Sequence, residues 1–411
     1  MTSFKSCTNT VAFNAKNFLK WIVIGTVTGI IIGAIASAFA HCLSFAANYR
    51  EENPNILFLL PIGGLIIVFL YKTLHYENNK GTDDVIDNIH HDVNVPLKMS
   101  FLIFVSTVIT VLCGGSVGRE GAALQIGGSL GSQIGRWLKF SKEDRKIILM
   151  SGMAAAFSAL FGTPIAAVFF SMEVASVGIM YYAALVPCIC ASLVAHCMAI
   201  FFHVEEEHFP MIAEQGLGLE MGGKVLILAI CCALLSILFC KSLEIMKGLY
   251  KKYLKNAYIR IVVAGLLVIL MTYLIGSRDY LGTGMHVIVK ALSGEAVPYA
   301  FLTKMIFTVV TITAGYKGGE IVPSFFIGAT FGCIFGQLLG LPAEFTASLG
   351  MIGVFCGVTN CPIASLLIGF ELFGYHNAYY LLIVTAVSYM LSGNYSLYHT
   401  QKIMYSKLEY K

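Results

Sequence analysis

Long stretches of sequence without a single charged side chain are the feature that most constrains this chain. The run Trp21–Ala40 has the ~20 apolar residues that an α-helix needs to cross the hydrocarbon core of a bilayer. Shorter runs would cross with the help of their flanking residues: Ile56–Tyr71, Phe101–Leu112, Val225–Phe239, Ile261–Ile275 and Tyr379–Leu391. Composition agrees, because only 12% of the residues are charged, whereas about a quarter are charged in a soluble domain. The sequence therefore predicts an integral membrane protein, embedded in the lipid bilayer.

The apolar runs favour helices over a β-barrel. Barrel strands alternate apolar and polar residues, whereas these runs are continuous. Other apolar segments are interrupted by glycine and proline: Gly121–Leu138, Pro164–Val177, Ile321–Leu338 and Pro362–Gly374. Such segments are typical of discontinuous helices that line a polar site. We expect one all-α, polytopic transmembrane domain with tilted and discontinuous helices, and no C-terminal soluble regulatory domain.

The same composition argues against several other classes of protein. The net charge is only +4 and the basic residues are dispersed, so a nucleic-acid-binding surface is not expected. The cysteines form no C-x-x-C pair, and neither G-x-S-x-G nor H-E-x-x-H occurs. We therefore expect no metal site, no cofactor and no enzymatic activity. His90 and His91, close to Asp83, Asp84 and Asp87, are interpreted as a solvated helix face rather than as metal ligands.

Lysine and arginine gather in two loops, Arg136–Lys146 and Lys247–Arg260, and near both termini. Loops rich in these residues tend to stay in the cytoplasm. The segment Glu205–His208, in contrast, is acidic. We expect both termini and the two basic loops in the cytoplasm, and the acidic segment outside.

The chain resembles itself at an offset of about half its length. Three pairs of stretches correspond, the first two 201 residues apart and the third 198: Gly81–Asp84 with Gly282–Met285, Ile126–Gly131 with Ile327–Gly332, and Thr163–Ala166 with Cys361–Ala364. Internal duplication is typical of secondary transporters and related channels. We predict two inverted-topology halves, at about residues 18–203 and 221–395, followed by a pore-lining segment at 396–411. Glycines at a spacing of four in the second pair permit close helix crossings.

Two glycine-rich stretches, Gly114–Gly121 and Lys317–Pro323, each stand directly before an apolar helix. Glycine lets backbone N–H groups turn toward a ligand. A helix N-terminus adds about half a positive charge and several donors without a partner. Two such termini that meet within the membrane would form an anion site without a full positive charge. Such a site can hold a permeating anion and still release it.

These motifs carry a family resemblance. Gly118-Arg119-Glu120-Gly121 resembles the signature at the start of the central helix of the CLC chloride channels and transporters. Gly318–Pro323 resembles a second signature of that family, and Gly81-Thr82 a third, more loosely. The resemblance covers residues from about 18 to 405. It implies a homodimer in a bacterial plasma membrane, with one pore in each subunit.

The resemblance also implies roles for individual residues. Glu120 corresponds to the gating glutamate, whose ionised carboxylate occupies an anion site and swings aside when protonated; the alternative is a structural pair with Arg119. Thr82 and Tyr398 would coordinate the central anion, although Tyr398 could instead belong to an interfacial aromatic belt. Backbone groups of the two glycine-rich stretches would complete the anion sites: Gly118, Arg119, Glu120, Gly121, Gly319, Glu320, Ile321 and Val322.

Several positions depart from the usual pattern of the family. Val174 stands where many chloride/proton exchangers have a proton-relay glutamate, so that relay is absent. Glu320 resembles the fluoride-transporting branch, where a second glutamate serves proton coupling, but it could also be an ordinary helix-capping acid. That branch usually has threonine where Val322 stands. Glu173 and Glu371, at matching positions of the repeat, are interpreted as structural hydrogen-bonding groups rather than as proton carriers.

Together these observations predict CLC-type transport of chloride or fluoride, coupled to protons as an antiporter and gated by Glu120. A passive chloride channel, gated by voltage or pH, is the alternative, and the missing relay acid at Val174 favours it. Thr82 argues for chloride and Glu320 for fluoride. A cation transporter would need acidic groups facing unwound carbonyls instead of glycine-rich helix starts. A membrane-embedded enzyme would need a nucleophile and a base that the motifs do not provide.

Overall fold

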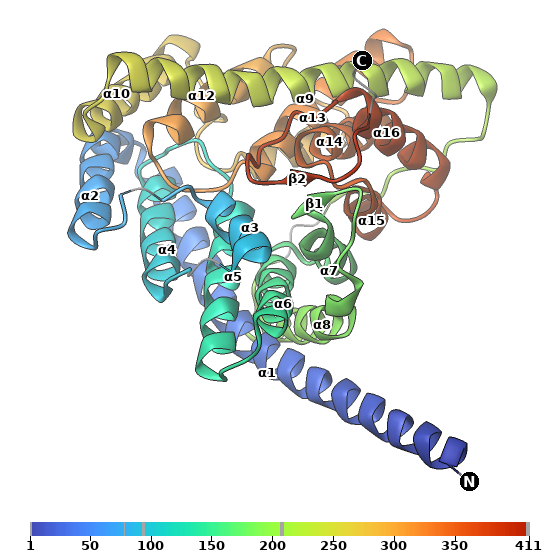
Figure 1. Cartoon of the computed structure of the whole chain (residues 1–411). Helices are drawn as coiled ribbons and strands as arrows, with labels where there is room; N and C mark the ends of the chain where they lie inside the picture. The colour runs from blue at the N-terminus through green and yellow to red at the C-terminus, as the bar shows by residue number, and fades with distance from the viewer. Residues whose placement is uncertain (1, 78, 93–94, 206–208, 408–411) are drawn as a thin grey trace.

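A computed structural model describes residues 2–77, 79–92, 95–205 and 209–407, and these are mostly helical (Figure 1). The helices of the first half are α1 (Thr2–Glu52), α2 (Leu60–Thr73), α3 (Thr82–His91), α4 (Leu97–Leu112), α5 (Glu120–Trp137), α6 (Lys142–Phe161), α7 (Pro164–Glu173) and α8 (Leu185–Phe201). Those of the second half are α9 (Leu219–Tyr253), α10 (Ala257–Ile275), α11 (Met285–Leu292), α12 (Ala300–Ala314), α13 (Ile321–Leu338), α14 (Ala343–Thr359), α15 (Pro362–Phe373) and α16 (Ala378–Leu391). Two 3-10 segments, η1 (Pro54–Leu59) and η2 (Tyr182–Ala184), and two short strands, β1 (Ser176–Val177) and β2 (Lys402–Ile403), complete the described part.

The prediction of an all-α membrane protein is confirmed. Six helical stretches in the described part of the chain are long and apolar enough to cross a bilayer: Phe13–Glu52, Pro54–Thr73, Tyr182–Phe201, Leu219–Tyr253, Ala257–Ile275 and Ile321–Leu338. The interrupted segments form the helices α5, α7, α13 and α15. Helices α7 and α15 begin at proline, and α5 and α13 begin at the ends of the glycine-rich stretches. Most of the expected acidic segment, residues 206–208, lies outside the described residues, as do 408–411 of the expected pore-lining segment.

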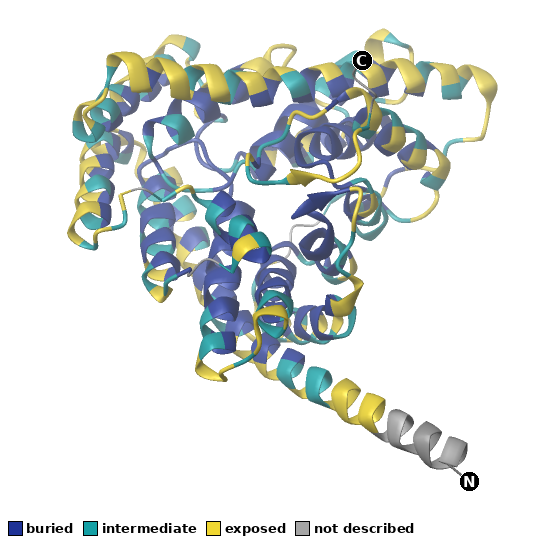
Figure 2. Cartoon of the chain, in the orientation of Figure 1, coloured by how far each residue is buried: buried dark blue, intermediate teal, exposed yellow. Residues whose placement is uncertain are grey.

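The helices form a buried centre and an exposed periphery (Figure 2). Helices α5, α6, α13 and α14 are buried along most of their length. Peripheral helices α2 and α10 expose large apolar side chains, for example Phe69 at 59% and Leu266 at 55%. Apolar side chains at the periphery are suited to contact with lipid, whereas the centre carries the backbone turns and the polar groups.

The central helices pack in two similar pairs, α5 with α6 and α13 with α14, and glycines make both crossings possible. A Cβ atom added to Gly127 of α5 would lie 2.2 Å from the carbonyl oxygen of Gly152 on α6. A Cβ atom added to Gly328 of α13 would lie 2.3 Å from the carbonyl oxygen of Gly350 on α14. The glycine spacing in the sequence therefore serves helix packing.

The C-terminal segment returns across the molecule between the two halves. Strand β2 runs parallel to β1, with Ser176 paired to Lys402 and Val177 to Ile403. The Gln401 side chain donates to the carbonyl oxygens of Val174 and Thr359, both at 2.9 Å. These contacts bring residues near 400 beside the ends of α7 and α14, and so place Tyr398 at the centre of the molecule.

Substitution of Gly127 by alanine tests the packing of the central helices. The added methyl group must push α5 away from α6, and such overpacking typically costs ~1–3 kcal/mol. We expect a lower thermal unfolding midpoint of the purified protein in detergent. Gly248→Ala on α9 is the matched control, because no atom lies within 4 Å of its added Cβ. That control should be neutral or should gain roughly 0.5–1 kcal/mol from helix propensity. Equal midpoints for the two variants would contradict the packing role.

Candidate functional site

The two glycine-rich turns are joined to one another by a pair of backbone hydrogen bonds. The N–H of Gly118 donates to the carbonyl oxygen of Gly319 at 2.6 Å, and the N–H of Gly319 donates to that of Gly118 at 2.8 Å. A Cβ atom on Gly319 would lie 2.5 Å from the nitrogen of Gly121, so no larger residue fits there. The bridge brings the N-terminus of α5 against the N-terminus of α13, as the sequence predicted.

This bridge corrects one expectation about the anion-binding groups. We expected the backbone of Gly118 and Gly319 to contribute to anion binding, but each N–H already donates to the other residue. The two glycines therefore join the helix starts and do not offer N–H donors to a ligand. The donors that remain are those of the first helical turns, where an α-helix has no internal partners for its N–H groups.

Glu120, the first residue of α5, is completely buried beside this bridge. Its carboxylate accepts a hydrogen bond from the N–H of Arg119 at 3.2 Å and another from the Arg119 Nε at 3.4 Å. The structural pair considered from the sequence is therefore present. The same contact places the carboxylate on Arg119 N–H, one of the donors expected to line the outer anion site. A carboxylate in that position excludes an anion from that donor.

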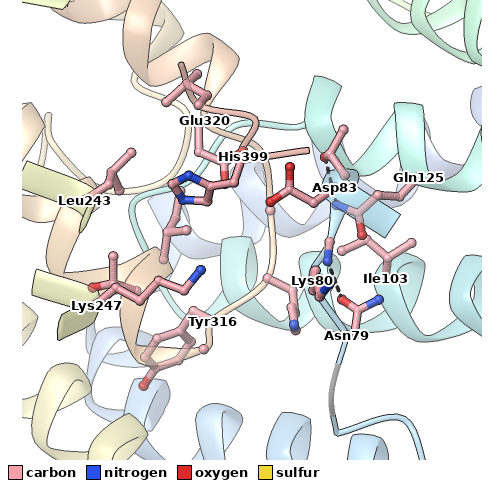
Figure 3. A pocket seen from close by; sticks show the side chains of 18 of the residues that line it. Asn79, Lys80, Asp83, Ile103, Gln125, Leu243, Lys247, Tyr316, Glu320 and His399 are labelled. Carbon is pink, nitrogen blue, oxygen red and sulfur yellow. Dashed lines mark hydrogen bonds between the residues drawn. The ribbon is translucent and has the colours of Figure 1, made fainter. Parts of the chain in front are cut away.

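Glu320, Thr82 and Tyr398 line a single pocket of about 300 Å³. Figure 3 shows this pocket, with Glu320 labelled. Glu320 directly precedes α13, and Thr82 is the first residue of α3. The Thr82 hydroxyl accepts a hydrogen bond from the Gln125 amide at 3.3 Å. Three residues that lie far apart in the sequence, and that we singled out there, thus meet at one cavity.

The phenol of Tyr398 is the most informative group of this pocket. Tyr398 is only 3% exposed, and its hydroxyl has no hydrogen-bond partner among the described residues. A buried hydroxyl without a partner is costly, at about 1–3 kcal/mol. A ligand that accepts a hydrogen bond would remove this cost, and an anion is such a ligand. Because the side chain is buried at the centre, Tyr398 does not belong to an interfacial belt.

Asp83 holds the backbone that carries Tyr398. The Asp83 carboxylate accepts hydrogen bonds from the N–H of Thr400 at 3.1 Å and from its hydroxyl at 3.0 Å. Asp83 is buried, and the His90 side chain meets the carbonyl oxygen of Ala175 at 2.8 Å. Our interpretation of this helix face as solvated was therefore wrong for Asp83 and His90, because the C-terminal segment and the β1 region cover them.

Glu173 and Glu371 cap the N-termini of each other's helices. The Glu173 carboxylate, at the end of α7, accepts from the N–H groups of Ile363 and Ala364 at the start of α15, at 3.2 and 2.9 Å. The Glu371 carboxylate, on α15, accepts from Ile165 and Ala166 at the start of α7, at 2.9 and 2.7 Å. The two acids therefore tie the two halves together through charge-assisted hydrogen bonds.

Sequence analysis missed most of the charged groups around the pocket. Besides Glu320, the ionisable side chains that line it are Glu77, Lys80, Asp83, Lys247, Arg260, Lys317 and His399. Lys247 and Arg260 were interpreted from the sequence only as markers of membrane topology. Gln125, in contrast, is visible as one of only two amides, with Gln133, among the mostly small and apolar residues of its segment. With four lysine and arginine side chains against three carboxylates, the pocket concentrates cations near the site, and this favours the entry of anions.

No group of three metal-ligating side chains occurs within the described residues. The nearest approach in the histidine-rich helix is between His91 and Asp87, at 3.8 Å. The pocket itself is lined by helix starts, hydroxyl groups and carboxylates together with lysine and arginine side chains.

Comparison with known proteins decides the family. A family model described as voltage gated chloride channel matches residues 63–393. The chain belongs to this family, the CLC channels and transporters. A chloride/fluoride channel protein of Pseudomonas syringae pv. tomato is 34% identical and is aligned over 94% of this chain and 87% of the relative. The sequence resemblance is therefore confirmed, and with it the identification of a CLC-type anion transport protein.

Solved structures of the family have the same fold. The crystal structure of a CLC-type fluoride/proton antiporter superposes with a TM-score of 0.90 at 31% identity, over 94% of this chain and 98% of that chain. A slow cyanobacterial chloride/proton antiporter superposes with a TM-score of 0.79 at 16% identity, over 90% and 94%. The second match concerns the fold alone.

Substitution of Tyr398 by phenylalanine tests the hydroxyl without a partner. A hydrogen bond to a charged group contributes ~1.5–3 kcal/mol, so anion binding, measured by isothermal titration calorimetry, should weaken roughly 10- to 100-fold. The unfolding midpoint without anion should be unchanged or higher, because a buried polar atom is removed. Tyr250→Phe is the control, since that hydroxyl donates to the Val310 carbonyl oxygen and should affect stability alone. Unchanged anion affinity in Tyr398→Phe would contradict the assignment.

Proposed function

We propose that this protein is a proton-coupled anion antiporter. The observation that carries the proposal is the meeting of two helix N-termini at the Gly118–Gly319 bridge, with an acid at each start, Glu120 and Glu320. Helix N-termini bind the anion without a full positive charge, and the carboxylates supply groups that exchange protons. A passive channel would need the anion path and the gate, but not a second acid at the pore.

The central anion site consists of the Tyr398 phenol, the Thr82 hydroxyl and the backbone N–H groups of Glu320 and Ile321. The partnerless phenol and its place in the same pocket as Glu320 support this assignment. An outer site uses the N–H groups of Arg119, Glu120, Gly121 and Val322. In this structure the Glu120 carboxylate already accepts from Arg119 N–H, which is the position a gating carboxylate would take when no anion is bound.

Glu120 serves as the gate, and Glu320 as the second proton-exchanging acid. Glu120 is completely buried, so protonation would release it from the N–H donor and free that donor for an anion. Glu320 faces the pocket that holds the central site, so it can exchange protons with water there. Val174 cannot carry a proton, and the Glu173 carboxylate is already engaged by two N–H groups. The proton path therefore uses the two helix-start acids.

Fluoride is the anion that we favour. Glu320 stands at the position that resembles the fluoride-transporting branch, and the fluoride/proton antiporter structure is 31% identical over nearly the whole chain. Chloride is the second candidate, because Thr82 and Val322 depart from that branch. A hydroxyl and a phenol can donate to either anion. Since fluoride is hydrated more strongly, the measured anion ranking decides between them.

The arrangement in the membrane follows from the charges and from the family. We propose a homodimer in a bacterial plasma membrane, with one pore in each subunit and both termini and the two basic loops in the cytoplasm. The two halves of the domain, about 18–203 and 221–395, are proposed to be an inverted repeat. The similar crossings of α5 with α6 and of α13 with α14 support it.

Substitution of Glu120 by glutamine or alanine tests the gate. Proton transfer by a positioned side chain contributes ~10²–10⁴-fold, so proton movement coupled to anion flux should fall roughly 100-fold or more. The measurement uses liposomes loaded with fluoride or chloride, with anion efflux and internal pH recorded together, with and without a potassium–valinomycin clamp. Glu143→Gln is the control, because this exposed carboxylate pairs only with Lys146 near the α5–α6 loop. Unchanged pH dependence in the Glu120 variants would rule out the gate.

Substitution of Glu320 by glutamine tests the second acid in the same liposomes. We expect uncoupled anion flux, in which the anion still moves but no longer drives protons against their gradient. Glutamine keeps the size and the hydrogen-bonding oxygen while it removes the exchangeable proton. Coupled flux equal to wild type would mean that Glu320 only caps the helix. The passive channel would then be the better interpretation.

A further inference from the structure

A second cationic cavity lies between the ends of α2 and α10, next to the pore pocket. It encloses about 360 Å³, and four cationic side chains line it: Lys72, Lys255, Arg260 and Lys317. Glu77 is the single carboxylate in its lining. Two tyrosines, Tyr71 and Tyr258, complete its polar wall. We call this cavity the α2–α10 groove.

The four cations of the α2–α10 groove have no carboxylate within 4 Å among the residues that the structure describes. The Arg260 Nε donates to the carbonyl oxygen of Ala314 at 2.9 Å, which leaves the two terminal nitrogens of the guanidinium for a ligand. The Lys317 ammonium lies 4.4 Å from the centre of the Tyr71 ring, and that of Lys72 lies 5.8 Å from the Tyr258 ring. Four clustered cations that share a single carboxylate in their lining, Glu77, repel one another and attract an anion.

The groove lies where two candidate spans end. One span, Pro54–Thr73, ends next to Lys72, and the other, Ala257–Ile275, begins next to Lys255. Figure 1 shows α2 and α10 at one edge of the molecule. Large apolar side chains flank the groove on these helices, with Phe69 59% exposed and Ile259 54% exposed. Charged groups at the ends of spans, beside exposed apolar side chains, match the boundary between the headgroups and the acyl chains of a bilayer.

We propose that the α2–α10 groove binds the phosphate of an anionic phospholipid. The guanidinium of Arg260 and the ammonium groups of Lys72 and Lys255 suit phosphate oxygens. The acyl chains would lie along the apolar face that includes Phe69. The lipid source is favoured over a free phosphate because the groove adjoins that apolar face. The groove shares Arg260 and Lys317 with the pore pocket, but lipid binding there does not depend on which anion is transported.

Two of the four cations also line the pore pocket, namely Arg260 and Lys317. A test of the groove must leave these two residues unchanged, or an effect on lipid could not be separated from an effect on the pore. Lys72 and Lys255 line the groove but not the pore pocket. Both are exposed, so their substitution should not disturb the fold.

The test measures lipid binding to purified full-length protein by native mass spectrometry, with phosphatidylglycerol and phosphatidylcholine as probes. Each lysine near a bilayer surface contributes ~1 kcal/mol toward an anionic lipid, so Lys72→Gln with Lys255→Gln should weaken phosphatidylglycerol binding roughly 30-fold. Phosphatidylcholine binding should not change. The matched control is Lys251→Gln with Lys252→Gln, which removes the same charge from the last turn of α9, outside the groove lining.

Three results would overturn the proposal. Equal phosphatidylglycerol binding by the groove variant and wild type, or equal losses in the groove and control variants, would mean that the groove is not the site. Binding of glycerol 3-phosphate is measured as well, to test whether the groove holds a soluble phosphate. If it binds as tightly as phosphatidylglycerol and displaces it, the groove holds a free phosphate and the assignment to lipid is wrong. Unchanged unfolding midpoints of both variants verify that the fold is intact.

Discussion

Two backbone hydrogen bonds between Gly118 and Gly319 are the interaction on which the rest of this structure depends. They hold together two turns from opposite halves of the chain, and each turn opens a central helix. Only glycine permits the approach, since a Cβ atom on Gly319 would overlap the backbone of Gly121. The bridge therefore converts two separate helix N-termini into one region of positive potential inside a protein that has few charges.

Two reciprocal carboxylates join α7 and α15, one helix from each half of the chain. Glu173 caps α15, and Glu371 caps α7, so each half satisfies the free N–H groups of the other. The C-terminal segment then crosses this junction through the β1–β2 pairing and the contact of Thr400 with Asp83. Its course fixes where Tyr398 points. The segment that carries Tyr398 is thus held in place by contacts with α3, with β1 and with the ends of α7 and α14.

The basic residues do more than indicate which loops lie in the cytoplasm. In the sequence, Lys247 and Arg260 marked a loop for the cytoplasm, and in the structure they line the pore pocket beside Glu320. Arg260 and Lys317 also reach the α2–α10 groove. A chain with 12% charged residues places many of its cations around two adjacent cavities. The same positive potential that favours an anion at the pore favours an anionic headgroup at the edge of the helices.

The sequence by itself determined the membrane setting, the helical fold, the two glycine-rich helix starts and the family, because apolar run length and glycine spacing are local properties of the chain. It also singled out Glu120, Glu320, Thr82 and Tyr398. Only the tertiary structure decided that the N–H groups of Gly118 and Gly319 are used by each other, and that Asp83 is buried against Thr400. These contacts join residues about 200 to 320 positions apart, and no local pattern encodes which donor meets which acceptor. The packing of the two halves against each other determines which of these donors and acceptors lie within hydrogen-bonding distance. The partners can therefore be identified only in the folded protein.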